Sequence, residues 1–327
     1  MYGAMIGDVI GSVYEFVPTK DEHFQPLFSP KCMITDDSVM TAAVAAALIS
    51  HHEEGVPFQK SVVAKMQCLG KQYPHAGYGS MFASWIRSRS PQPYGSYGNG
   101  SAMRVSPCGI YADSLEEALN LAKQSAVVTH NHREGVAGAE AVAGSIYLAK
   151  TGAEKDEIRR FVSQYYDLHR TLDDIRPSYR FEVSCQKSVP EAITAFLESD
   201  CFESAVRLAV SLGGDADTQG AIAGSIAWAY YDVNPTDYDK ANNGWILAEA
   251  QKFIPADFQK LASDLQRISA QHFYDRKKKS KNPGLAWRMR HSPEFFVYLP
   301  GRIYLFEDFF NYRRRYWIKW LLLTFFD

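Results

Sequence analysis

The sequence TDDSVMTAAVAAALIS occupies residues 35–50 and decides the fold class. Its part from Ser38 to Ser50 is dominated by alanine, the residue with the highest helix propensity. Asp36 and Asp37 stand just before this part, where side-chain oxygens bond the free amides at the start of a helix. The stretch therefore predicts a helix of small side chains that packs closely against its neighbours.

Six further segments show the apolar periodicity of helices. They are Ser114–Val128, Gly135–Lys150, Glu154–Tyr166, Val189–Ser199, Phe202–Leu212 and Thr218–Tyr231. Alternation typical of strands is scarce, and no βαβ repeat is present. Because glycine and alanine are dense in several of these helices, we predict an all-α fold, an orthogonal multi-helix bundle.

The composition is that of a globular protein. The chain has 327 residues, 46% hydrophobic and 22% charged, so it can bury a large core. Its net charge of −2 gives no reason to expect nucleic-acid binding. The 5 cysteines are scattered without a CxxC pair, which favours reduced thiols over a disulfide framework or a zinc site. With no basic start and no apolar run near the ~20 residues that cross a bilayer, we expect a cytoplasmic protein.

The sequence predicts two parts, a body at residues 1–270 and a basic, aromatic-rich C-terminal extension at residues 271–327. The basic run Arg276–Lys281 and the following Asn282-Pro283-Gly284 are typical of a linker. From Arg276 onward, twelve Lys and Arg stand against four Asp and Glu, among many aromatic residues. Packing onto the body, an interface for a partner and contact with a membrane surface remain three open interpretations of the extension.

Two clusters of acidic and hydroxyl side chains stand at predicted helix starts. One is Thr35-Asp36-Asp37, and the other is Asp215-Ala216-Asp217-Thr218. Helix capping explains either cluster alone, because Asp, Ser and Thr are favoured there. Their shared composition favours a metal site, since a helix needs only one cap and Mg²⁺ prefers carboxylate and hydroxyl oxygens. If the two helix starts converge, they form a site for two metal ions.

Three other segments fit a cleft beside these clusters. Glu15 follows Gly7–Gly11 by one turn, so its carboxyl can point at the metals, although an ordinary surface glutamate fits equally. The glycine-rich loop at residues 98–104 is a candidate for binding a diphosphate through backbone amides, with a plain surface turn as the alternative. The run Thr129-His130-Asn131-His132 offers two imidazoles, which capping or hydrogen bonding also explains.

Five motifs taken together resemble the ADP-ribosylglycohydrolase family. They keep the family's order and spacing over roughly residues 1–260, and they read GDVIGSVYE (7–15), TDDS (35–38), GNGSAMR (98–104), THNHREGV (129–136) and GGDADTQGAIAG (213–224). The resemblance implies an all-α orthogonal fold. It also implies a hydrolase that cleaves ADP-ribose from an ADP-ribosylated protein or from a small ADP-ribose conjugate.

The resemblance further implies a binuclear Mg²⁺ centre, for which Mn²⁺ is an alternative. Thr35, Asp36 and Asp37 would serve one side of it, and Asp215, Asp217 and Thr218 the other. The loop formed by Asn99, Gly100, Ser101, Ala102 and Met103 would hold the diphosphate, and His130 would lie along the ligand groove. Glu15 matches a family carboxylate that approaches the scissile ribose.

The catalytic residues that we expect are Glu15, Asp36 and Asp37. Cleavage at the ribose passes through an oxocarbenium-like centre, so the ribose must be held and a water molecule supplied. Asp36 or Asp37 would activate the water, and Glu15 would position the ribose. The sequence leaves the aglycone open among arginine, serine, O-acetyl and other groups. It also leaves the alternative of a catalytically silent relative that binds ADP-ribose or serves a structural role.

Overall fold

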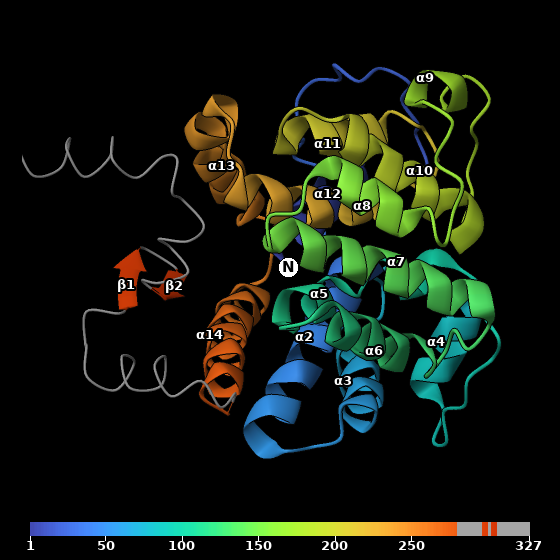
Figure 1. Ribbon diagram of the computed structural model, residues 1–327. Helices are drawn as coiled ribbons and strands as arrows, with labels where there is room; N and C mark the ends of the chain where they lie inside the picture. Colours follow the sequence, from blue (N-terminus) through green and yellow to red (C-terminus); the bar gives the residue numbers. More distant parts are fainter. Residues whose placement is uncertain (280–295, 300–301, 306–327) are drawn as a thin grey trace, which may run out of the picture. The chain divides into compact units, whose positions relative to one another are not determined.

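The computed structural model describes residues 1–279, 296–299 and 302–305 (Figure 1). The chain divides into two units, Met1–Leu265 and Gln266–Asp327. In the first unit, which we call the body, the regular elements of the described residues are helices, apart from one isolated bridge between Gly98 and Ser184. The all-α prediction is therefore confirmed.

The helices of the described residues follow one another along the chain, and a long connection at residues 12–35 separates α1 from α2. Their bounds are α1 Tyr2–Gly11, α2 Asp36–Glu54, α3 Phe58–Gln72, α4 Ser80–Arg87, the 3₁₀ turn η1 Asn99–Ser101, α5 Ser106–Tyr111, α6 Leu115–Ala126, α7 Arg133–Lys150, α8 Lys155–Val162, α9 Leu172–Ile175, α10 Cys185–Glu198, α11 Phe202–Val210, α12 Ala216–Val233, α13 Asp237–Ala250 and α14 Ala256–Lys279. The seven helices predicted from the sequence correspond to α2, α6, α7, α8, α10, α11 and α12. Their ends shift by a few residues, as capping geometry rather than periodicity sets them.

One predicted boundary differs from the structure. Helix α14 runs without a break from Ala256 to Lys279, so Arg276–Lys279, which we interpreted as the start of a linker, is helical, and the rest of that basic run lies outside the described residues. Lysine and arginine are good helix formers, and a basic run therefore does not by itself end a helix.

Part of the second unit is a β-hairpin. Strand β1 (Phe296–Leu299) pairs antiparallel with β2 (Arg302–Leu305), and Phe296 lies opposite Leu305. The rest of the extension, on which the three interpretations of its role depend, lies outside the described residues. Within the part of the chain that the structure describes, no helix has the length and apolarity needed to cross a membrane.

Helix α12 is the centre of the body and contacts α1, α7, α10 and α11 (Figure 1). Every residue from Ala216 to Ala227 is buried, so this part of the helix is surrounded by the rest of the body on all sides. Helix α1 comes closest to it. A Cβ atom on Gly7 would lie 2.0 Å from the carbonyl oxygen of Gly220, and one on Gly11 would lie 2.3 Å from that of Ala216. Only glycine permits backbones to approach to this degree.

We expect Gly7→Ala to destabilise the body strongly, because its new methyl group would overlap the backbone of α12. The expected loss is about 3 kcal/mol of unfolding free energy, measured by urea denaturation. Gly244→Ala is the matched control in the interior of α13, where an added Cβ has no atom within 4 Å. That change should stabilise the protein by about 0.5–1 kcal/mol. Equal effects of the two substitutions would contradict the close contact of α1 with α12.

Candidate active site

The first turns of α2 and α12 meet at one buried place. The Thr218 hydroxyl donates a hydrogen bond of 3.1 Å to Oδ2 of Asp37 and so joins the two helix starts. Asp37, Asp215 and Asp217 are all buried. The structure thus brings together the two clusters that the sequence places 180 residues apart.

Asp8 of α1 completes this group, and sequence reasoning did not select it. Its carboxylate accepts hydrogen bonds from the Thr35 hydroxyl at 2.8 Å, from the Thr35 amide at 3.0 Å and from the Ser38 amide at 3.0 Å. Asp8 is fully buried and attaches the end of α1 to the start of α2. The available clue was a single carboxylate inside an otherwise apolar helix, between Gly7 and Gly11.

Two more predicted carboxylates border the same place. Oxygens of Glu15, Asp215 and Asp217 lie within 4.8 Å of one another. Asp36 is only partly buried, and its amide donates to the carbonyl oxygen of Ala76 at 2.7 Å. Glu15 is also partly buried, so these two carboxylates form the side of the group that is open to solvent.

The electrostatics show carboxylates crowded away from water. Burial, followed by the charge of Asp217, raises the pKa of Asp8 to about 7, and the same two causes raise the pKa of Glu15 to about 7. For Asp36, Asp37 and Asp215, burial and then the charge of Asp217 raise the pKa well above its ordinary value. Each carboxylate therefore makes its neighbours harder to ionise.

The six carboxylates fit a site for divalent cations. Among the described residues, none of them has an ion pair with Lys, Arg or His. Oδ1 of Asp37 is buried and lacks a hydrogen-bond partner in the part of the chain that the structure describes. An uncompensated buried charge is costly, and oxygen-only donors suit hard divalent ions. The residue types and their burial therefore match the predicted metal centre.

The glycine-rich loop lies beside this group. The Asn99 side-chain amide donates to Oδ2 of Asp215 at 2.8 Å, and the Asn99 backbone amide donates to the carbonyl oxygen of Val183 at 2.8 Å. The backbone amides of Ala102 and Met103 both donate to the Asn99 carbonyl oxygen. They are used within the turn, so the prediction that they bind a diphosphate is wrong for these two amides.

Burial of several loop residues limits further which of them a ligand can contact. Ser101 and Ala102 are fully buried, and the Ser101 hydroxyl donates to the carbonyl oxygen of Gly135 at 2.6 Å. Met103 is buried too, and its sulfur lies 3.8 Å from the Thr218 hydroxyl oxygen. Within residues 98–104, Gly98 and Gly100 are partly exposed, whereas Asn99 is buried like Met103.

The two predicted histidines have different positions. His130 is buried against this loop, its Nδ1 lies 2.7 Å from the Thr129 hydroxyl, and burial followed by the charge of Arg104 lowers its pKa. Nδ1 of His132 accepts from the Glu134 amide at 3.2 Å, which is a helix cap for α7. For His132, the structure supports the alternative of simple capping.

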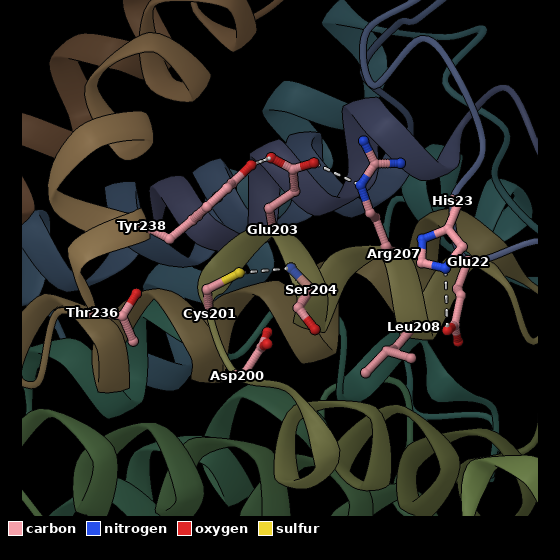
Figure 2. A pocket seen from close by; sticks show the side chains of 10 residues that line it. All are labelled: Glu22, His23, Asp200, Cys201, Glu203, Ser204, Arg207, Leu208, Thr236 and Tyr238. Atoms are coloured by element: carbon pink, nitrogen blue, oxygen red, sulfur yellow. Dashed lines mark hydrogen bonds and ion pairs between the residues drawn. The ribbon is translucent and has the colours of Figure 1, made fainter.

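A cavity of about 430 Å³ lies elsewhere in the body (Figure 2). Its lining includes Glu203, Arg207 and Tyr238 but none of the predicted site residues. As Figure 2 shows, Oε1 of Glu203 pairs with Arg207 Nε at 2.6 Å and Oε2 accepts from the Tyr238 hydroxyl at 2.5 Å. These polar groups already satisfy one another, and the acidic group remains the candidate active site.

Comparison with known proteins finds relatives that hydrolyse ADP-ribose conjugates, three of which follow. Human ADP-ribosylhydrolase ARH3 is 26% identical, with 76% of this chain and 90% of the relative aligned. The ADP-ribosylarginine hydrolase Tri1 of Pseudomonas putida is 28% identical over 72% of this chain and 70% of its own length. The ADP-ribosyl-[dinitrogen reductase] glycohydrolase of Rhodospirillum rubrum is 28% identical over 75% and 86%, respectively.

The fold and the family profile agree with these relatives. A solved structure described as an ADP-ribosylglycohydrolase-related protein complex superposes with a TM-score of 0.60 and 25% identity, covering 82% of this chain and 95% of that one. The profile of the family described as ADP-ribosylglycohydrolase matches residues 1–270, which include all the acidic residues of the site. The chain therefore belongs to the ADP-ribosylglycohydrolase family of enzymes.

Proposed function

We propose that this enzyme hydrolyses the glycosidic bond between ADP-ribose and its carrier at the acidic group, with two bound Mg²⁺ ions. The observation that carries the proposal is the convergence of six carboxylates without a cationic partner among the described residues. The relatives named above, ADP-ribosylhydrolases, support the reaction. The proposed substrate is an ADP-ribosylated protein or a small ADP-ribose conjugate.

The cations would be held by two sets of oxygens. Thr35, Asp36 and Asp37 form one set, and Asp215, Asp217 and Thr218 form the other, with Mn²⁺ as an alternative to Mg²⁺. The hydroxyls of Thr35 and Thr218 donate their protons to Asp8 and Asp37, respectively. The Thr35 oxygen also accepts from the Asp37 amide, which leaves one lone pair of Thr35 and the lone pairs of Thr218 for a cation. Bound divalent ions would hold the ribose hydroxyls and make water more acidic.

Carboxylates of the chain would transfer protons and position the ribose. Asp37 has one oxygen engaged by Thr218, while its other oxygen lacks a hydrogen-bond partner among the described residues and can accept a proton from water. Asp36 stands at the solvent side and is the alternative base. Glu15, beside Asp215 and Asp217, would position the ribose and is close enough to exchange a proton with the reacting group.

We expect Asp217→Asn to reduce Mg²⁺-dependent release of ADP-ribose by about 10³-fold or more, because Asp217 acts on every other carboxylate of the group. Circular dichroism should show an intact fold, since the change removes a buried negative charge. Asp237→Asn is the matched control, an exposed carboxylate in the first turn of α13. It should leave turnover unchanged, and retained turnover in Asp217→Asn would contradict the metal assignment.

We expect the metal-free enzyme to lose stability as the pH rises. Asp8 and Glu15, with pKa values of about 7 in the folded state, hold protons that the unfolded chain releases near the ordinary pKa values of 3.8 and 4.5. The folded state thus binds more protons between about pH 4 and pH 7, and stability falls with pH across this window. Because cations bind ionised carboxylates, Mg²⁺ should raise the Tm more at about pH 8 than at about pH 6.

Thermal unfolding in EDTA and in Mg²⁺ at both pH values measures this difference. Asp217→Asn is the comparison variant, since it should lose most of the Mg²⁺-dependent rise in Tm. A rise of equal size in both proteins would place the cations elsewhere.

A further inference from the structure

Arg104, the last residue of the GNGSAMR motif, is a buried cation next to the glycine-rich loop. It is 1% exposed, and no carboxylate forms an ion pair with it among the described residues. Its Nη1 donates to the carbonyl oxygen of Gly100 at 3.1 Å. Its Nη2 donates to the carbonyl oxygen of Ser125 at 2.7 Å and to the Thr129 hydroxyl at 2.9 Å. Arg104 therefore connects the loop to the segment that carries His130.

The hydrogen bond from Arg104 determines what the Thr129 hydroxyl can do. A guanidinium only donates, so the Thr129 oxygen accepts from Arg104 and has one proton of its own to give. Two acceptors are near this oxygen, Nδ1 of His130 at 2.7 Å and the carbonyl oxygen of Ala126 at 3.5 Å. The Ala126 carbonyl oxygen already accepts from the Thr129 amide at 3.1 Å and from the His130 amide at 2.8 Å, so it has no lone pair left for a hydroxyl 3.5 Å away. If Nδ1 of His130 were the donor, the buried Thr129 proton would have no acceptor among the described residues. The Thr129 proton therefore points at His130, and Nδ1 of His130 is an acceptor.

The other ring nitrogen faces the loop. An added Cβ on Gly100 would lie 3.3 Å from Nε2 of His130, and one on Gly98 would lie 3.6 Å from it. In a neutral imidazole, an accepting Nδ1 requires that the proton be on Nε2. Burial and the nearby charge of Arg104 lower the pKa of His130 and so favour the neutral ring.

We propose that Arg104 and Thr129 are positioning residues that hold His130 as the tautomer with its proton on Nε2, directed to donate a hydrogen bond to the substrate at the Gly98–Gly100 loop. The hydrogen bond from His130 to the substrate rests on the proposed function, in which that substrate carries ADP-ribose. The acceptor is a phosphate or hydroxyl oxygen of the ligand, since both accept from an imidazole N–H. The tautomer itself is a property of the free protein.

Thr129→Val tests the proposal because it removes the hydroxyl while nearly keeping the volume. The backbone at this position has its own hydrogen bonds, from the Thr129 amide to Ala126 and from the Tyr94 amide to the Thr129 carbonyl oxygen, so the segment stays in place. Thr129→Ser restores the hydroxyl. Thr194→Val is the matched control, a buried threonine in α10 whose hydroxyl donates to the carbonyl oxygen of Pro190.

Two measurements apply to each full-length variant. Nitrogen-15 NMR of histidine-labelled protein identifies which ring nitrogen of His130 is protonated, with its signals assigned by their loss in His130→Asn. Calorimetry with free ADP-ribose and Mg²⁺ gives the dissociation constant. We expect a proton on Nε2 in the wild type and a changed tautomer distribution in Thr129→Val. That variant should bind ADP-ribose about tenfold more weakly, while Thr129→Ser and Thr194→Val should resemble the wild type.

The outcomes that overturn the proposal are distinct from failure of the proposed function. A proton on Nδ1 of His130 in the wild type refutes it, as does a Thr129→Val protein with unchanged tautomer and unchanged affinity. A wild type that shows no binding of ADP-ribose contradicts the proposed function instead. The NMR result then decides the tautomer alone.

Discussion

The backbone contact between α1 and α12 is the constraint on which the site depends. Gly3, Gly7 and Gly11 face Gly224, Gly220 and Ala216, so the two helices run antiparallel with their register fixed at every fourth residue. The contact ends where α1 stops and α12 begins. Glu15, four residues beyond Gly11, is thereby brought beside Asp215 and Asp217, and Asp8 is held one turn before that end. A bulkier pair of helices would separate these carboxylates.

Without a bound cation, the buried negative charge of the site is electrostatically unfavourable. Burial and then the charge of Asp217 raise the pKa of the five carboxylates around it, which are Asp8, Glu15, Asp36, Asp37 and Asp215. The starts of α2 and α12 give partial compensation, since the amides of a helix N-terminus favour negative charge. The number of carboxylates at these helix starts exceeds what a helix cap requires, because Thr35 alone already caps α2 by accepting from the Asp37 amide. A group of this kind is kept for ligand binding rather than for stability.

The sequence predicted the parts of this arrangement that depend on local pattern. These parts are the alanine-rich and amphipathic helices, the two acidic helix starts and the family. Each could be predicted because it depends on residues that are contiguous in the sequence. Asp8 was missed because its partners, Thr35 and Ser38, become neighbours only after α1 and α2 pack together. The amides of Ala102 and Met103 were misjudged because a glycine-rich motif does not show that its turn closes on the Asn99 carbonyl oxygen. The continuation of α14 into the basic residues Arg276–Lys279 was likewise missed, since a basic composition alone does not terminate a helix.

The most direct test of the account is the release of free ADP-ribose by the full chain. ADP-ribosylated arginine, ADP-ribosylated serine and O-acetyl-ADP-ribose serve as substrates, each with Mg²⁺ and with EDTA. The account predicts release from at least one of the three in Mg²⁺ and its loss in EDTA, and the substrate that reacts identifies the aglycone. Release that persists unchanged in EDTA, or no release from any of the three in Mg²⁺, would contradict it.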